Sequence, residues 1–224
     1  MEEIKLNCVY NCDCLELMRA MVAAGLKVDW CITDPPYGIG EDGKKNHSRG
    51  FATASRQYTP KEWDKQRIGE EYFDLIRLVS NNQIIFGGNY YTDYLPPTAN
   101  WVIWDKRCQD SMRNDFADGE MAWASKGGTR IFHYLYNGML QDDMKNKDDR
   151  FHPTQKPTQL WFKLIDYYTK PGDIILDPFM GSFTTAVCAY KSGRKFIGAE
   201  LDKEYYELGQ KRLEKVMRQI SFFD

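Results

Sequence analysis

Two consecutive prolines, Pro35 and Pro36, place the strongest local constraint on how this chain can fold. Proline fixes the backbone φ angle and has no N–H group, so a central strand cannot continue through it. The preceding segment 28–33 is apolar and β-branched, which predicts a buried strand. We therefore expect the strand to end in a rigid turn that presents a carboxylate at Asp34 and an aromatic ring at Tyr37.

Apolar strands alternate with amphipathic helices over the rest of the chain. We predict strands at 83–86, 101–104, 122–124, 131–136, 173–177 and 195–199, helices at 66–82, 157–168, 184–191 and 203–219, and loops at 38–60 and 138–150. The strands at 122–124 and 131–136 are expected to pair around Gly127 and Gly128. This alternation predicts an α/β fold with a mostly parallel sheet flanked by helices, and ligands bind at the carboxyl ends of such strands.

Size and composition are those of one globular domain. The chain has 224 residues, of which 42% are hydrophobic and 28% are charged, enough for a single α/β domain with a substantial core. No apolar run approaches the roughly 20 residues of a membrane span, and no signal-peptide pattern follows Met1. We expect one domain over residues 1–224, located in the cytoplasm and without a membrane partner.

The cysteines and histidines do not form a pattern typical of a metal site. Three of the six cysteines fall within the first 14 residues, but Cys12 and Cys14 are too close together for a usual zinc knuckle. The histidines, His47, His133 and His152, are far apart in the sequence. We expect reduced thiols and no metal ion.

A basic segment follows the prolyl turn. The chain as a whole has a net charge of −2, so it is not a generally basic nucleic-acid binder. Between residues 43 and 67, however, seven basic residues outnumber two acidic ones, which gives a local charge of +5. We predict that residues 41–65 form a flexible loop that contacts phosphates, with a merely solvated loop as the alternative. The candidate contacts are Lys44, Lys45, Arg49 and Arg56.

A second chemical motif is expected where the strand at 173–177 ends. After Asp177 comes Gly181, whose lack of a side chain would let a ligand approach the backbone closely. Glu200 closes the next strand about 20 residues on, where a carboxylate accepts hydrogen bonds from ribose hydroxyls in nucleotide-binding α/β folds. The glycine pattern of dinucleotide sites is absent. The motif favours a nucleoside-containing cofactor such as S-adenosylmethionine, with an ordinary strand–helix turn as the alternative.

The turn at Asp34 offers the groups that would hold an exocyclic base amine. Because Pro35 and Pro36 have no N–H groups, the Asp34 carboxylate and the Pro35 carbonyl remain available as acceptors. Two acceptors can hold the two N–H groups of an amine and direct its lone pair towards an electrophilic methyl group. Tyr37 could stack on a base taken out of the duplex. For the tetrapeptide alone, a rigid surface turn with an Asx hydrogen bond is the alternative.

Together, these motifs resemble the S-adenosylmethionine-dependent amino-methyltransferases of DNA in the permuted β-class order, in which the catalytic motif precedes the cofactor motif. The matching segments are Asn11-Cys-Asp13-Cys14, Asp34-Pro35-Pro36-Tyr37, Phe86-Gly-Gly-Asn89, Trp101-Val-Ile-Trp-Asp-Lys106, His152-Pro-Thr-Gln-Lys156-Pro157, Asp177-Pro-Phe-Met-Gly-Ser-Phe-Thr-Thr185 and Phe196-Ile-Gly-Ala-Glu200. The resemblance spans nearly the whole chain. It implies a Rossmann-like methyltransferase fold with a circularly permuted motif order.

The resemblance also implies roles for individual residues. Glu200 would bind the ribose hydroxyls, Asp13 and Cys14 would flank the adenine, and Lys156 with Phe179 would lie at the methionine end. The full predicted cofactor site consists of Asp13, Cys14, Asp34, Lys156, Asp177, Pro178, Phe179, Gly181, Ser182, Thr184, Glu200 and Leu201. The predicted catalytic residues are Asp34, Pro35, Pro36 and Tyr37. No metal is required.

Three features depart from the family pattern. Phe183 stands where the family loop usually has a second glycine, and a left-handed conformation there would cost a bulky residue roughly 1 kcal/mol or more. We expect either a rearranged loop or weaker cofactor binding. Cys12 stands where a glycine is usual. Only about residues 127–151 are available for a target-recognition insert, which is larger in other members.

The resemblance implies a site-specific methyltransferase of a restriction-modification system that acts on double-stranded DNA. Adenine N6 is favoured over cytosine N4, because Asp-Pro-Pro-Tyr accompanies adenine more often in the family. The alternatives are methylation of cytosine N4, a catalytically silent DNA-binding relative, and a methyltransferase of protein glutamine or RNA. A nicotinamide dehydrogenase is disfavoured by the missing glycine pattern. Since the insert is small, we expect a homodimer.

Overall fold

The computed structural model describes residues 3–40, 66–107, 117–137, 140–142, 145 and 154–221. Its central sheet has eight strands in the order β1-β10-β9-β2-β3-β5-β4-β6. The strands are β1 (Cys8–Tyr10), β2 (Val28–Thr33), β3 (Ser80–Phe86), β4 (Trp101–Asp105), β5 (Gly119–Ala124), β6 (Arg130–His133), β9 (Ile174–Asp177) and β10 (Lys195–Ala199).

Most neighbouring strands run parallel. The five strands from β1 to β3 in the sheet order form one parallel block, β5 is antiparallel to both β3 and β4, and β6 is parallel to β4. In the parallel block the strands are buried on both faces, as in β2, where Cys31, Ile32 and Thr33 are all buried. The predicted α/β fold with a mostly parallel sheet is confirmed.

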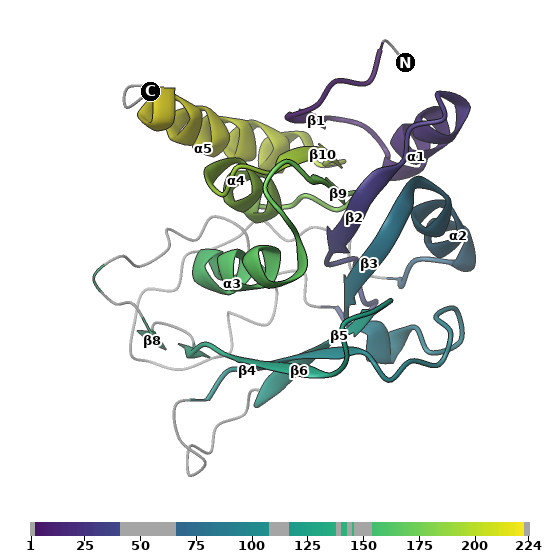
Figure 1. Cartoon of the computed structure of the whole chain (residues 1–224), viewed down its shortest axis with the longest axis vertical. Coiled ribbons are helices and arrows are strands. Elements are labelled where there is room, and N and C mark those ends of the chain that lie inside the picture. The colour runs from purple at the N-terminus through teal and green to yellow at the C-terminus, as the bar shows by residue number, and fades with distance from the viewer. Residues whose placement is uncertain are drawn as a thin grey trace.

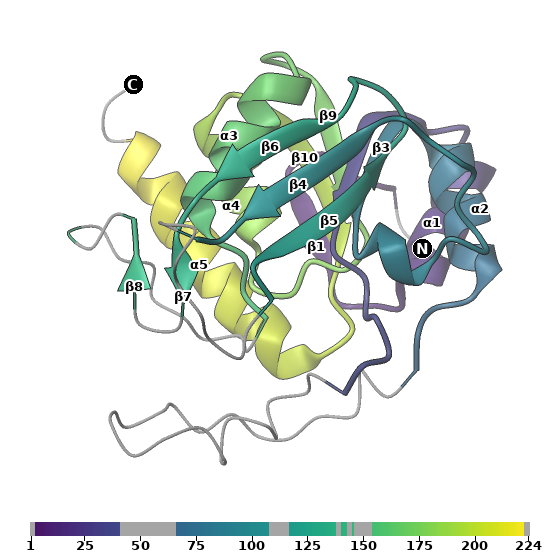
Figure 2. The same cartoon turned by 90° about the horizontal axis from the view of Figure 1, so that it is seen from below.

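Helices cover both faces of the sheet, which makes three layers (Figure 1). On one face, α1 (Cys14–Ala23) and α2 (Glu70–Val79) pack over β2 and β3. On the other face lie α3 (Thr158–Tyr168), α4 (Thr184–Lys191) and α5 (Lys203–Ser221). Figure 2 shows β4, β5 and β6 side by side, with α1 and α2 at the right of the view. The two apolar cores therefore lie on opposite faces of the sheet.

The predicted pairing of the strands at 122–124 and 131–136 is wrong. β5 lies between β3 and β4, and β6 pairs with β4 instead, with Ile103 opposite Ile131. The helix predicted at 66–82 is also shorter at both ends. α2 begins only at Glu70, and residues 80–82 are extended and pair with β2. The small ribbon of β7 (Tyr136–Asn137) and β8 (Leu140–Gln141) reaches into a segment expected to be a loop.

The remaining predictions about local structure concern thiols and membrane spans. Cys8, Cys12, Cys14, Cys31 and Cys188 are free thiols, and Cys108 lies outside the described residues. None of the helices in the described part of the chain combines the length and apolar character of a membrane span.

Phe183 adopts the left-handed conformation, with φ 60° and ψ 23°, directly before α4. Its side chain is fully buried and its ring lies against Gly209 of α5, where a Cβ atom would come 2.2 Å from Phe183 Cδ1. Burying a phenylalanine contributes about 1.5–3 kcal/mol, which offsets the roughly 1–2 kcal/mol cost of left-handed backbone. The loop thus keeps its left-handed turn, and the expected rearrangement is not observed.

We predict that Gly209→Ala lowers the free energy of unfolding by about 1–2 kcal/mol. Overpacking costs about 1–3 kcal/mol, and a Cβ atom 2.2 Å from Phe183 Cδ1 places this site in the upper part of that range, at about 2–3 kcal/mol. The better helix propensity of alanine returns about 1 kcal/mol. Urea unfolding followed by circular dichroism measures the change. Lys211→Ala, at an exposed position of the same helix, is the control and should stay within about 0.5 kcal/mol of the unsubstituted protein. A Gly209→Ala variant of unchanged stability would contradict the packing described here.

Candidate active site

A cavity of about 1030 Å³ opens at the carboxyl ends of β2, β9 and β10. This volume is at the upper end of the range for small-molecule sites. The cavity wall contains every residue predicted to bind the cofactor: Asp13, Cys14, Asp34, Lys156, Asp177, Pro178, Phe179, Gly181, Ser182, Thr184, Glu200 and Leu201. Pro36 also lines the cavity, and Pro35 is buried in the same turn. The structure thus brings together residues from both ends of the sequence.

Other parts of the wall were not foreseen from the sequence. They include Tyr72 of α2, Trp161 of α3 and Tyr205 of α5, together with Arg67. Tyr72 and Phe179 have ring centroids 6.0 Å apart, so two aromatic rings lie side by side at the cavity. No sequence motif marks the three aromatic residues, because an aromatic residue on an amphipathic helix is usually read as part of the core.

Asp177 connects the predicted cofactor loop to the neighbouring strand β2. Its carboxylate accepts hydrogen bonds from Thr33 Oγ1 at 2.7 Å, Thr185 Oγ1 at 2.6 Å and the Phe179 N–H at 3.1 Å. Burial raises the pKa of Asp177 to about 6, although these donors favour the charged form. Asp177 therefore connects β9, β2 and α4 at the base of the cavity.

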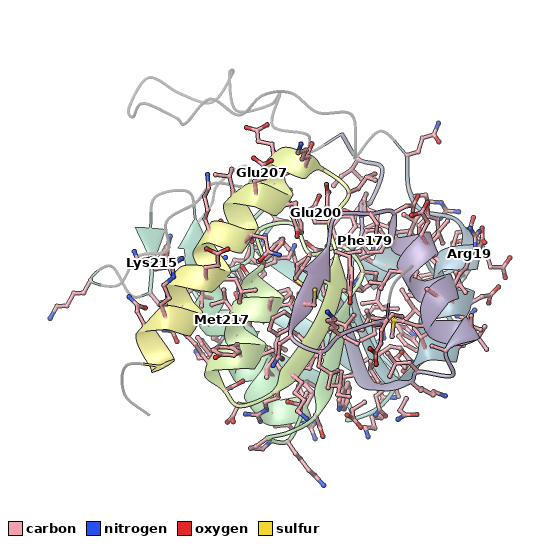
Figure 3. All side chains as sticks on the ribbon, turned by 90° about the horizontal axis from the view of Figure 1, so that it is seen from above. Arg19, Phe179, Glu200, Glu207, Lys215 and Met217 are labelled. Carbon is pink, nitrogen blue, oxygen red and sulfur yellow. The ribbon has the colours of Figure 1, made fainter. Side chains whose placement is uncertain are left out.

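Glu200 links the loop after β9 to the end of β10. Its carboxylate accepts from the N–H groups of Gly181 at 2.7 Å and Asp202 at 2.8 Å. Burial raises the pKa of Glu200 to about 7, despite these two donors. In Figure 3, Glu200 and Phe179 lie near each other between α1 and the start of α5.

The segment before α1 is fixed against the same strand ends. Asn11 Nδ2 donates to the carbonyl groups of Glu200 and Leu201, at 2.8 and 3.2 Å. Asp13 caps α1 by accepting from the Leu15 N–H at 2.8 Å. This explains why a residue near the N-terminus, Asp13, lies in the same cavity as Glu200.

The Asp34 turn is held in one geometry by side chains around it. Tyr37 Oη donates to Asp34 Oδ1, Lys156 Nζ lies 2.5 Å from Asp34 Oδ2, and Tyr91 Oη donates to the Pro36 carbonyl. The Tyr37 ring stacks on Tyr90, with centroids 5.1 Å apart and planes 19° from parallel. The Asp34 carboxylate therefore faces the cavity in a fixed position.

Gly87, after β3, leaves the space that the Tyr37 ring occupies. A Cβ atom at Gly87 would lie 2.1 Å from Tyr37 Cε1, and the backbone φ of 66° is left-handed. Glycine is thus required here for two reasons, close approach and conformation. Gly87, one of the two glycines that the sequence linked only to a family core strand, thus makes room for the predicted catalytic turn.

Charged side chains of both signs lie near Asp34. Lys156 Nζ lies 3.1 Å from Glu120 Oε2, and Lys106 Nζ contacts Glu120 Oε1. Burial raises the pKa of Asp34, and the Lys156 ammonium only partly counteracts it. Burial would lower the pKa of Lys156, but the carboxylates of Asp34 and Glu120 outweigh it and raise the pKa. Burial would likewise raise the pKa of Glu120, but the two ammonium groups outweigh it and lower the pKa.

Several predicted residues lie outside the described part of the chain. These are Lys44, Lys45, Arg49 and Arg56 of the basic segment, all of residues 41–65, and His152. The predicted recognition insert at 127–151 is described only at 127–137, 140–142 and 145. Within the described residues, no group of three or more His, Cys, Asp or Glu side chains is arranged to hold a metal ion.

Comparison with known proteins gives a consistent result. A family model described as DNA methylase, N6_N4_Mtase, matches residues 90–211. The type II methyltransferase M2.LlaDCHI of Lactococcus lactis subsp. cremoris is 31% identical over 226 residues, which cover 84% of this chain and 82% of that protein.

Two of the similar solved structures match over most of this chain. The crystal structure of the M1.HpyAVI–SAM complex is 26% identical, with a TM-score of 0.60 and coverage of 92% of this chain and 98% of that chain. The cytosine-N4-specific PvuII DNA methyltransferase is 17% identical, with a TM-score of 0.56 and coverage of 94% and 89%. At that identity, the second structure shows a shared fold only.

The raised pKa of Asp177 predicts a pH-dependent stability. An unfolded aspartate titrates near 3.8, whereas native Asp177 titrates near 6, so between these values the native state holds a proton that the unfolded chain has released. The free energy of unfolding therefore falls as the pH rises from about 4 to about 6. Asp177→Asn should gain stability relative to the unsubstituted protein over this interval, measured by urea unfolding at several pH values. A stability difference between Asp177→Asn and the unsubstituted protein that does not change with pH would refute the assignment.

Proposed function

The chain belongs to the N6/N4 DNA methylase family, and on that premise we propose that it methylates the N6 amine of adenine in a specific sequence of double-stranded DNA. S-adenosylmethionine is the cofactor. The observation that carries the proposal is the Asp34 carboxylate, which lies in the cavity wall and is fixed by Lys156 and Tyr37.

The residues of the cavity fit S-adenosylmethionine. The volume suffices for a nucleoside and an amino acid, and Glu200 supplies a carboxylate suited to ribose hydroxyls. Asp13 and Cys14 would flank the adenine, while Phe179, Gly181 and Thr184 would surround the methionine. When bound, the cofactor supplies an electrophilic methyl group. The protein's part is to bind it with that group directed towards Asp34.

Asp34 and the Pro35 carbonyl would hold the amine of a base that has left the duplex. Both are acceptors, so they bind the two N–H groups and leave the lone pair facing the methyl group. As positive charge develops on the amine, a carboxylate fixed beforehand stabilises it without having to reorient. Catalysis would thus consist mainly of positioning, with Tyr37 beside the base.

Adenine is preferred over cytosine because Asp34 is the first residue of the catalytic tetrapeptide, and in the family Asp-Pro-Pro-Tyr goes more often with adenine. Cytosine N4 is the second candidate, since its amine makes the same demands on Asp34. The test is to methylate bacterial genomic DNA, digest it to nucleosides and identify the product by mass spectrometry. N6-methyladenine supports the proposal, and N4-methylcytosine as the only product contradicts it.

The biological setting is also part of the proposal. A type II relative supports a role in restriction-modification, in the cytoplasm. The basic residues Lys44, Lys45, Arg49 and Arg56 would contact DNA phosphates, and residues 127–151 would contribute to target recognition. A homodimer would compensate for so small a recognition insert. Sequencing the methylated DNA gives the recognition sequence.

We predict that Asp34→Ala lowers kcat at least 100-fold, because it removes the fixed acceptor for the amine, an effect of about 10²–10³ for comparable groups. The Kd of S-adenosylmethionine, measured by calorimetry, should change only a few-fold, which also shows that the variant is folded. Asp166→Ala replaces an exposed aspartate and should retain full activity. Turnover retained in Asp34→Ala would disprove the assigned role.

We also predict that S-adenosylmethionine binds more weakly below pH 7. Glu200 has a pKa of about 7 in the free protein, and only its carboxylate form can accept from both ribose hydroxyls and backbone N–H groups. Affinity should therefore be full above pH 7 and roughly tenfold lower at pH 6. Calorimetry at pH 6 and 8 measures the effect. Glu200→Gln should bind more weakly at both values and lose the pH dependence; a dependence equal to that of the unsubstituted protein would rule out Glu200 as its source.

A further inference from the structure

Four charged side chains from distant parts of the sequence form a continuous row beside the catalytic turn. Lys106 follows β4, Glu120 lies in β5, Lys156 precedes α3, and Asp34 follows β2. Lys106 contacts Glu120, Glu120 lies 3.1 Å from Lys156, and Lys156 lies 2.5 Å from Asp34. The two lysines and two carboxylates together have no net charge. Only the Asp34 and Lys156 end of this charge row lines the cavity.

The Lys156 ammonium has capacity for a further acceptor. A lysine has three N–H donors, and in the described structure its charged partners are Asp34 Oδ2 and Glu120 Oε2. The contact with Glu120 lacks hydrogen-bond geometry, so Glu120 Oε2 has no hydrogen-bond partner there. The ammonium is almost completely buried, with 10% of the side chain exposed, and it adjoins the cavity. A ligand next to Asp34 is therefore within reach of a fixed positive donor.

A fixed acceptor next to a fixed donor is complementary to the Watson–Crick edge of adenine and to that of cytosine. On the Watson–Crick edge, the adenine N6 amine is a donor and the adjacent N1 is an acceptor; cytosine N4 and N3 show the same order. Guanine also has an exocyclic amine, but on this edge its neighbour N1–H is a donor, which a lysine would repel. The Asp34 and Lys156 pair therefore selects an amine next to an unprotonated ring nitrogen.

We propose that Lys156 donates a hydrogen bond to the ring nitrogen adjacent to the target amine, while Asp34 accepts from that amine. This inference rests on the proposed function and specifies how the target base is recognised. It differs from the expectation that Lys156 contacts the methionine end of the cofactor.

Glu120 is the positioning residue in this arrangement. It lies against the ammonium of Lys156, and Lys106 in turn contacts Glu120 while lying over the Trp104 ring, 4.6 Å from its centroid. Trp104 is buried in the core, so the far end of the charge row is fixed to the sheet. Glu120 also balances the charge of Lys156, which would otherwise repel the positive charge that develops on the amine.

The experiment compares two target bases in an oligonucleotide with the protein's own recognition sequence. The target is either adenine or 1-deazaadenine, in which a C–H group replaces N1. Single-turnover rates should fall roughly 10- to 100-fold for the unsubstituted protein on 1-deazaadenine, as expected for loss of a hydrogen bond to a charged group. Lys156→Met should be slower on adenine yet lose less than about threefold on the same replacement. If the target base is cytosine, the comparison is between cytosine and 3-deazacytosine.

Dividing the rate loss of the unsubstituted protein by the rate loss of Lys156→Met cancels the electronic effect of the deaza base, because both proteins experience it. Glu120→Gln should show a rate loss on the deaza base that lies between those of the unsubstituted protein and Lys156→Met, with an unchanged Kd for S-adenosylmethionine. A merely structural role would not produce this combination. Lys163→Met replaces an exposed lysine of α3 and should keep the full discrimination.

Two results would overturn the inference. One is equal methylation of both bases by the unsubstituted protein, which requires no variant to fold. The other is a Lys156→Met variant whose discrimination is unchanged, or whose only defect is weaker binding of S-adenosylmethionine by calorimetry. If the unsubstituted protein methylates no DNA at all, the proposed function fails instead, so the two failures are distinguishable.

Discussion

The hydrogen bonds that Asp177 accepts from Thr33 and Thr185 join the two halves of the active site. Thr33 immediately precedes Asp34, and Asp177 begins the cofactor loop, so one buried carboxylate fixes the distance between the catalytic turn and the cofactor site. The bond is possible because β2 and β9 are parallel neighbours whose carboxyl ends meet at one edge. Without that adjacency, residues 144 positions apart would not share a cavity.

This geometry explains why residues far apart in the sequence could be expected to line one cavity. Asp13, Asp34, Asp177 and Glu200 each directly follow a strand of the parallel block or lie within a few residues of its end, and a parallel sheet brings such ends together whatever the order of the motifs along the chain. The strand ends therefore identified one part of the cavity wall, whereas Tyr72, Trp161 and Tyr205, which lie on helices, were not foreseen. The roles of the individual residues within it stay predictions.

The parts that could not be predicted depend on contacts between distant segments. Glu120 is one acidic residue in a strand of mixed composition, and only the pairing of β5 between β3 and β4 brings it to Lys156. Likewise, the cost of Phe183 in left-handed backbone could be read from the loop, but Gly209, which makes room for its ring, lies on another helix. The length of α2 was overestimated at both ends. At its C-terminal end, residues 80–82 pair with β2 instead of continuing the helix.

The charge row also affects the balance between burial and ionisation at Asp34. In the proposed mechanism Asp34 holds the amine as a carboxylate, yet burial favours the neutral acid and raises the pKa of Asp34. Lys156 counteracts burial and keeps the carboxylate an acceptor, but a single ammonium would disfavour the positive charge that forms on the amine. Glu120 cancels that charge, and Lys106 in turn stabilises Glu120. Because buried ion pairs seldom add net stability, the proposed reaction accounts for the row better than a contribution to folding does.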